Sequence, residues 1–315
     1  RQMCIRDSFL TRMPSPKIIF QAFAEVKPHI VIAVPLIIEK IIKKNVLPKL
    51  ETLKMKILLK VPIINDKIKA TVREHMIQGF GGNFHEIIIG GAAFNQEVEQ
   101  LLKSIDFPYT VGYGMTECAP IISYEDWKRF KPGSCGKSAP RMEVRIDSPD
   151  PENIVGEILT RGDNVMLGYY KNPEATAQVI DKDGWLHTGD LGVMDAAGNI
   201  TIKGRSKNML LGPSGQNIYP EEIEDKLANM PLVAENIVIQ QADHKLTALV
   251  YPDFEEAYAQ GMTDADIAQV MENNRIALNE ELPGYSQITR ITIQPEEFEK
   301  TPKKSIKRFL YQDIK

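Results

Sequence analysis

Short apolar runs alternate with helical patterns through the first third of this 315-residue chain, and no other feature constrains its fold as strongly. The expected elements are, in order, a strand at 29–35, helices at 36–44 and 71–80, a strand at 86–91, a helix at 95–104 with Asn95 as its N-cap, and a strand at 109–113. This order predicts a parallel α/β sheet, in which ligands bind beyond the carboxyl ends of the strands. Two glycine-bearing loops, GGAAF at 90–94 and GYGMTE at 112–117, follow such ends.

The pattern changes after residue 132. Short alternating runs between Gly, Pro, Asn and Asp turns predict a small antiparallel β unit at 133–204, with one helix near 173–180. The elements expected beyond it are a helix from Pro220, strands at 233–240 and 246–251, a helix at 263–282 and a strand at 288–293. We therefore expect a large domain at 1–206, α/β to about 132 and β-rich from 133, a polar link at 204–207, and an α+β domain at 207–315.

Composition excludes several classes of protein. The formal net charge of −4 gives no electrostatic reason to expect nucleic acid as a partner. The 3 cysteines and 5 histidines show no metal-binding spacing, which argues against a disulfide framework or a zinc site. The most apolar stretch, 30–42, is interrupted by Pro35, Glu39 and Lys40, whereas a membrane span needs about 20 apolar residues. We expect a cytoplasmic location, with peripheral membrane contact left open.

The hexapeptide at 112–117 can bind a nucleotide. Its glycines allow close approach of a flat ligand, and the Tyr113 ring between them could stack on a base. The Thr116 hydroxyl can bond a phosphate oxygen, and Glu117 can hold Mg²⁺, which prefers one or two carboxylates together with phosphate oxygens. The alternative is a strand-end turn with a buried tyrosine.

Two further segments could carry chemistry. In DGWLHTGD at 183–190, the last three residues are expected to end a strand, and Asp190 could take both hydroxyls of a ribose. His187 is expected only to pack, and the alternative for Asp190 is a turn cap. In the segment at 204–224, Arg205 could bond a ribose or a phosphate, and the loop around Gly215 could line a channel. The alternatives there are a linker and a surface loop.

Taken together and in this order, the three segments resemble the adenylate-forming superfamily of acyl-CoA synthetases, peptide-synthetase adenylation domains and luciferases. The similarity extends over nearly the whole chain from about Pro16. It is strongest with bacterial long-chain fatty acid–CoA ligases, through AVPLIIEKI at 33–41 and the segment at 198–224. The fold implied is the C-terminal part of that enzyme fold: an α/β sheet subdomain, a small β subdomain and a separate α+β lid domain.

The resemblance implies a two-step reaction that uses ATP, Mg²⁺ and coenzyme A. A fatty acid carboxylate attacks ATP to give acyl-AMP, and the coenzyme A thiol then displaces AMP. For the nucleotide, the resemblance implies adenine contact by Tyr113 and Gly114, ribose contact by Asp190 and Arg205, α-phosphate contact by Thr116 and Mg²⁺ binding by Glu117. It implies that Gly90, Gly91 and Ala92 form the wall of the adenine and acyl pocket. It also implies a domain hinge at Lys207 and a coenzyme A channel along Gly215, Gln216 and Asn217.

The chain departs from the family pattern in two places. The family's Gly- and Ser/Thr-rich phosphate loop does not occur, so we expect a C-terminal half to two-thirds that cannot make acyl-AMP alone. Ser305 stands where the family has its catalytic lysine, and Lys304 is the expected substitute, with Lys303 next. The alternatives to a CoA ligase are an acyl–acyl-carrier-protein synthetase, a non-catalytic fragment that binds AMP or acyl-adenylate, and a generic α/β domain.

Overall fold

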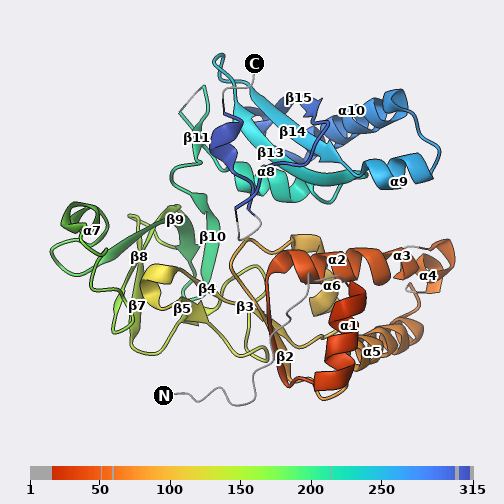
Figure 1. Ribbon diagram of the computed structural model, residues 1–315, viewed down its shortest axis with the longest axis horizontal. Coiled ribbons are helices and arrows are strands. Elements are labelled where there is room, and N and C mark those ends of the chain that lie inside the picture. Colours follow the sequence, from red (N-terminus) through yellow and green to blue (C-terminus); the bar gives the residue numbers. More distant parts are fainter. Residues whose placement is uncertain (1–15, 51, 59, 214, 302–304, 313–315) are drawn as a thin grey trace. The chain divides into compact units, whose positions relative to one another are not determined.

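The computed structural model describes residues 16–50, 52–58, 60–213, 215–301 and 305–312 (Figure 1). The chain divides into two compact units. The first comprises residues up to 143 together with 161–169 and 196–200, and the second comprises 144–160, 170–195 and the residues from 201 onward. The expected domain boundary near residue 206 stays a prediction.

A parallel sheet forms the centre of the first unit. Its strands follow the order β1 (Ile30–Ala33), β2 (Glu86–Ile89) and β3 (Tyr109–Val111). The helices of this unit are α1 (Pro16–Val26), α2 (Pro35–Asn45), α3 (Leu47–Leu50), α4 (Leu53–Leu58), α5 (Pro62–Gly79) and α6 (Gln96–Ser104). Strands and helices share one apolar core, in which Ile42, Phe80, Ile87 and Leu102 are each at most 2% exposed. The predicted parallel α/β sheet is confirmed.

The sequence predicts the start of α6 correctly and the burial of β1 only in part. The Asn95 side chain accepts a hydrogen bond from the Val98 N–H at 3.1 Å, so the predicted N-cap is confirmed. β1 was expected to be a buried strand, but Ile30 and Ile32 are 51% and 81% exposed, whereas Val31 is buried. That expectation is wrong for one face of β1, because the described apolar core packs only against the face that carries Val31.

The expected strand at 109–113 is two strands that belong to different sheets. β3 ends at Val111, and the Gly112 N–H still bonds the carbonyl of Ile89 at 2.9 Å. Tyr113 then pairs with Ser123 in an antiparallel sheet. The strands of that sheet are β4 (Tyr113–Gly114), β5 (Ile121–Tyr124) and β6 (Lys137–Ser138). The chain therefore leaves the parallel sheet within the GYG motif.

A four-stranded sheet follows, with antiparallel pairing of β8 and β9. Its strand order is β10 (Ile200–Arg205), β9 (Leu186–Met194), β8 (Gly156–Gly162) and β7 (Met142–Asp147). The helix α7 (Pro173–Val179) begins at Asn172, whose side chain accepts from the Ala175 N–H at 3.0 Å. The predicted β unit with one helix is confirmed. The expected link at 204–207 is wrong for Gly204 and Arg205, which are the last residues of β10.

The remainder of the second unit has an α+β arrangement, as predicted. Its elements are the hairpin of β11 (Leu210–Leu211) and β12 (Asn217–Ile218), then α8 (Pro220–Leu227), β13 (Val233–Gln240), β14 (Leu246–Pro252), α9 (Phe254–Ala259), α10 (Asp264–Glu281) and β15 (Ile288–Ile293). β14 pairs antiparallel with β13 and parallel with β15. Leu227 of α8 and Leu278 of α10 are fully buried in the core that covers this sheet. Among the described helices, none is both long and apolar enough to cross a membrane.

Candidate active site

The two glycine-bearing loops lie side by side at the carboxyl ends of β2 and β3. Besides the Gly112–Ile89 bond, a Cβ atom on Gly90 would lie 3.1 Å from the Gly112 carbonyl oxygen. Gly91 has a φ of +92°, which turns the chain away from the sheet, and both Gly91 and Ala92 are exposed. The topology of the parallel sheet thus brings together the two loops that the sequence singled out.

Tyr113 is buried in β4, whereas Gly114 is exposed but has backbone atoms close on one side. Tyr113 is 8% exposed, so its ring offers little free surface to a base, and its stacking role stays a prediction. A Cβ atom on Gly114 would lie 1.8 Å from the carbonyl oxygen of Pro120. Because no side chain fits there, glycine is required at the residue that leads into the next turn.

Glu117 lies in a 3₁₀ turn, Thr116–Cys118, and a distant segment holds it there. The Tyr169 hydroxyl donates to Glu117 Oε1 at 3.0 Å, and the Met166 N–H donates to the Glu117 carbonyl at 2.7 Å. Burial, and then the contact with Glu117, raise the pKa of Tyr169, which keeps its hydroxyl a donor at neutral pH. Sequence reasoning missed Tyr169, whose one local signal is the tyrosine pair that it forms with Tyr170.

The Thr116–Glu117 pair suits a metal ion that is shared with a nucleotide. The Glu117 side chain is half-buried and Thr116 is exposed. Among the described residues, no three His, Cys, Asp or Glu side chains gather into a metal site. A single carboxylate completed by phosphate oxygens is a donor set that Mg²⁺ accepts. Glu117 therefore fits the predicted ion without a closed protein cage.

We expect Cys118, beside Glu117, to resist alkylation in the folded protein. Its thiol is fully buried, and burial followed by the charge of Glu117 raises its pKa to about 11. At pH 8 roughly 0.1% would be thiolate, against roughly a quarter for an ordinary cysteine. Mass spectrometry after iodoacetamide treatment, with and without urea, measures this, and half-buried Cys135 serves as the internal comparison. Equal labelling of folded and unfolded Cys118 would contradict the expectation.

A β-bulge presents Asp190. Three residues of β9, Thr188 to Asp190, stand opposite the single residue Ile158 of β8. Thr188 Oγ1 donates to the Ile158 carbonyl at 2.7 Å and accepts from the Asp190 N–H at 3.1 Å, while Gly189 has a φ of +70°. A bulge of this kind changes the direction of a side chain within a continuing strand. The expectation that Thr188–Asp190 ends a strand is therefore wrong, since β9 continues to Met194.

The bulge brings Asp190 and Arg205 together. Asp190 Oδ1 lies 3.0 Å from Arg205 Nε, and the two side chains are 6% and 60% exposed. The Gly189 carbonyl also accepts from the Ser206 N–H at 2.9 Å, which joins the bulge to the end of β10. The pair sets a buried carboxylate against an exposed guanidinium, and the chemistry of these two groups suits hydroxyl groups and a phosphate.

His187 does more than pack, so that expectation is wrong. Its Nδ1 lies 2.9 Å from Glu157 Oε2, and the other Glu157 oxygen accepts from the Gly189 N–H at 2.9 Å. Sequence reasoning missed Glu157 because it lies on β8, 32 residues before the glycine that it bonds.

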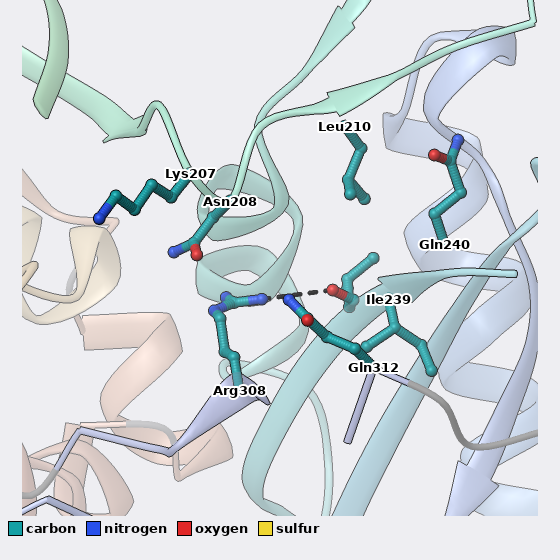
Figure 2. A pocket seen from close by; sticks show the side chains of 8 residues that line it. Lys207, Asn208, Leu210, Ile239, Gln240, Arg308 and Gln312 are labelled. Atoms are coloured by element: carbon teal, nitrogen blue, oxygen red, sulfur yellow. Dashed lines mark hydrogen bonds between the residues drawn. The ribbon is translucent and has the colours of Figure 1, made fainter. Parts of the chain in front are cut away.

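The expected hinge residue, Lys207, is exposed and lines a small pocket of the second unit (Figure 2). The residues around this pocket are Lys207, Asn208, Leu210, Val238, Ile239, Gln240, Arg308 and Gln312. Arg308 Nη1 donates to the Val238 carbonyl at 3.3 Å, which the dashed line in Figure 2 marks. The pocket volume of about 200 Å³ is below the range of roughly 300–1,000 Å³ for small-molecule sites. We assign it no ligand.

The remaining expected site residues lie in the β11–β12 hairpin and in the last segment of the described chain. Gly215 and Gln216 are exposed in the turn between β11 and β12, and Asn217 is the exposed first residue of β12; the Gly212 N–H bonds the Gln216 carbonyl at 2.8 Å. Ser305 is also exposed, and its N–H donates to Thr301 Oγ1 at 3.3 Å. The two candidate lysines, Lys303 and Lys304, lie outside the described residues.

Two protein-family models match this chain. The family model described as AMP-binding enzyme matches residues 2–170, and the model for the AMP-binding enzyme C-terminal domain matches residues 208–312. The chain belongs to the AMP-binding enzyme family. The resemblance to adenylate-forming enzymes, drawn from the three motifs, is confirmed.

Curated members of this AMP-binding family match parts of the chain. A long-chain-fatty-acid–CoA ligase of Escherichia coli O157:H7 is 41% identical over 152 residues, which cover 46% of this chain and 27% of that enzyme. 4-Coumarate–CoA ligase 5 of Oryza sativa subsp. japonica is 35% identical over 196 residues, which cover 58% of this chain and 36% of that enzyme. The match therefore spans about a third of the length of these relatives.

Solved structures of AMP-binding enzymes share the fold. ATP-bound MatB from Rhodopseudomonas palustris superposes with a TM-score of 0.70 at 21% identity, covering 96% of this chain and 54% of MatB. At this identity the likeness concerns the fold alone. It confirms the predicted fold class, an α/β sheet subdomain and a small β subdomain followed by a separate α+β C-terminal domain.

Proposed function

We propose that this protein is an ATP-dependent acyl-CoA ligase, which converts a carboxylic acid to acyl-AMP and then to acyl-CoA. The observation that carries the proposal is the bulge at Thr188–Asp190, which sets the Asp190 carboxylate against Arg205. A carboxylate held in this way suits the two hydroxyls of a ribose. Membership of the AMP-binding family supports AMP as the nucleotide that carries this ribose.

We further propose a long-chain fatty acid as the carboxylic acid. The E. coli relative that is named for this substrate is 41% identical over its match, against 35% for the rice coumarate ligase, although a Rhodococcus jostii CoA ligase named for another acid is also 41% identical. The segments at 33–41 and 198–224 also favour the bacterial fatty acid ligases. Comparing kcat/KM for palmitate and for 4-coumarate tests this choice, and a higher value for 4-coumarate would contradict it.

In the proposed first half-reaction, a carboxylate oxygen of the acid bonds to the α-phosphorus of ATP. The bond from that phosphorus to the bridging oxygen breaks, and its electron pair leaves with pyrophosphate. Thr116 donates to an α-phosphate oxygen, while Asp190 and Arg205 hold the ribose. Glu117 would hold Mg²⁺, which neutralises phosphate charge when bound. Lys304, or failing that Lys303, supplies positive charge in place of the lysine that Ser305 replaces.

In the proposed second half-reaction, the coenzyme A sulfur loses its proton and bonds to the acyl carbonyl carbon. The mixed-anhydride bond breaks, and AMP leaves with the electron pair. We propose that residues 207–315 rotate about Lys207 between the two steps, so that one site serves two transition states. The exposed hairpin at Gly215–Asn217 would then line the channel for the thiol. An acyl-carrier-protein thiol is the alternative acceptor.

Binding and turnover together test the proposed function. Calorimetry with AMP should give a defined affinity for the 315-residue chain. We expect this chain not to make acyl-AMP alone, so turnover is measured on the full-length enzyme with ATP, Mg²⁺, palmitate and either coenzyme A or carrier protein. Thioester formation on one thiol alone identifies the acceptor. AMP binding without any thioester would favour the non-catalytic alternative, and failure to bind AMP would contradict the nucleotide site itself.

We expect Tyr169→Phe to raise the concentration of divalent metal ion needed for half-maximal ATP-dependent metal binding by roughly 3- to 10-fold. The change removes one hydrogen bond of about 1 kcal/mol that fixes Glu117 and leaves the ring in place. Titration of Mn²⁺ by electron paramagnetic resonance, in the presence of ATP, measures the affinity. Tyr170→Phe, at the 88% exposed neighbour, is the control that should change nothing. Equal metal affinity in both variants would contradict the role of Tyr169.

A further inference from the structure

The Glu157 carboxylate contacts two residues of β9, Gly189 and His187, which lie close to Asp190 in sequence. Glu157 of β8 accepts from the Gly189 N–H through Oε1, and its Oε2 lies against His187 Nδ1, each at 2.9 Å. The Glu157 and His187 side chains are 27% and 37% exposed, so water competes only in part for these bonds. Both contacts fall within three residues of Asp190 on β9.

The Gly189 N–H needs an acceptor other than a strand carbonyl, because Gly189 lies in the bulge and outside the regular pairing of β8 with β9. Regular pairing of β8 with β9 stops at Glu157 on one side of the bulge and resumes at Leu159 on the other. A backbone N–H that loses its ladder partner must be satisfied by another acceptor, and the Glu157 side chain is that acceptor here. The left-handed backbone at Gly189, which turns Asp190 toward Arg205, is thereby held from the neighbouring strand.

His187 holds Glu157 in this position. With Nδ1 as donor, the imidazole fixes one carboxylate oxygen and leaves the other for Gly189. His187 Nε2 lies 3.9 Å from Asp181 Oδ2. The backbone N–H groups of Trp185 and Asp183 hold that aspartate and lower its pKa. The histidine is thus placed between two anchored carboxylates and has little freedom to turn away.

We propose that Glu157 and His187 are positioning residues of the ribose subsite, which hold the Thr188–Asp190 bulge so that Asp190 is oriented before the nucleotide binds. This inference rests on the proposed function, because it takes Asp190 as the residue that bonds the ribose hydroxyls. Neither side chain needs to touch the nucleotide. Their effect passes through the backbone of Gly189 and should depend on the ribose hydroxyls alone.

The test compares AMP with 2′,3′-dideoxy-AMP, which lacks both hydroxyls, by calorimetry on the 315-residue chain. Glu157→Ala should weaken AMP roughly 10-fold and change dideoxy-AMP less than 2-fold. Glu157→Gln should restore affinity to within about 3-fold, because an amide offers an acceptor to Gly189 and a donor to the other His187 tautomer. Glu143→Ala, which removes a carboxylate of β7 paired with Arg161, is the matched control and should leave both affinities unchanged.

Further variants keep the test decisive. His187→Phe preserves ring volume and should weaken AMP about 3-fold, which covers the case in which Glu157→Ala does not fold. Adding Glu157→Ala to Asp190→Ala should produce no further loss. Equal weakening of AMP and dideoxy-AMP, or no weakening of either by Glu157→Ala and His187→Phe, would overturn the inference. If Asp190→Ala itself shows no hydroxyl-dependent loss, the proposed function fails instead.

Discussion

Replacing Gly114 with alanine is expected to lower the free energy of unfolding by at least about 3 kcal/mol. The new Cβ atom would lie 1.8 Å from the Pro120 carbonyl oxygen, 2.8 Å from the Pro120 carbonyl carbon and 3.0 Å from Ile121 Cα. All three atoms are backbone, so no side chain can rotate away, and β4 and β5 must separate. Urea unfolding followed by circular dichroism measures the change.

The same motif provides the control. A Cβ atom on Gly112 would meet its nearest neighbours, the Ser123 carbonyl oxygen and Ile88 Cγ2, at 3.6 and 3.9 Å, which are ordinary contacts. We therefore expect Gly112→Ala to change the free energy of unfolding by less than about 1 kcal/mol. Two glycines separated by one tyrosine should thus differ strongly. Similar unfolding curves for the two variants would show that the Gly114 contact can relax and would contradict the prediction.

The parts of the fold that the sequence predicted depend on local chemistry. Asn95 caps its helix because its side chain and the Val98 N–H are separated by one helical turn. The loops at Gly90 and Gly112 lie together because parallel strands place their carboxyl ends at one edge. These relationships follow from spacing and topology, which a single sequence displays.

The contacts that the sequence did not predict join segments that are far apart along the chain. Tyr169 reaches Glu117 over 52 residues, and Glu157 reaches Gly189 over 32. Nothing in a tyrosine or a glutamate on an alternating strand indicates its partner, because that partner is chosen by tertiary packing. The sequence wrongly predicts the end of a strand at Thr188–Asp190 for a related reason, since Thr, Gly and Asp are turn residues in isolation. In the fold they interrupt a strand without ending it.

Tyr113 illustrates a further gap between motif and structure. Two flanking glycines suggest a ring that is free to stack on a base, yet the side chain is 8% exposed. The glycines serve the backbone: Gly112 carries the chain out of the parallel sheet, and Gly114 lets β4 pass Pro120. The same residue types therefore satisfy a packing requirement before any ligand is considered. The nucleotide proposal consequently depends most on Asp190, which the Thr188–Asp190 bulge sets against the exposed Arg205.

Asp190→Ala is expected to weaken AMP binding roughly 100-fold. Hydrogen bonds to a charged group contribute about 1.5–3 kcal/mol each, and the carboxylate would bond two ribose hydroxyls, so the loss is about 3 kcal/mol or more. Because the Asp190 side chain is 6% exposed and lies 3.0 Å from Arg205 Nε, we also expect the variant to unfold at a lower temperature. Calorimetry with AMP and thermal unfolding on the same samples separate the two effects.

An aspartate–arginine pair elsewhere is the control for Asp190. Asp163 lies 3.7 Å from Arg141 with both side chains mostly exposed, and Asp163→Ala should leave AMP affinity within 2-fold of the unaltered protein. Asp190→Asn keeps the shape of the side chain and removes its charge, so it should lose roughly 10-fold or more while remaining folded. If AMP affinity survives both Asp190 changes in folded protein, the bulge presents its carboxylate for some purpose other than binding a ribose.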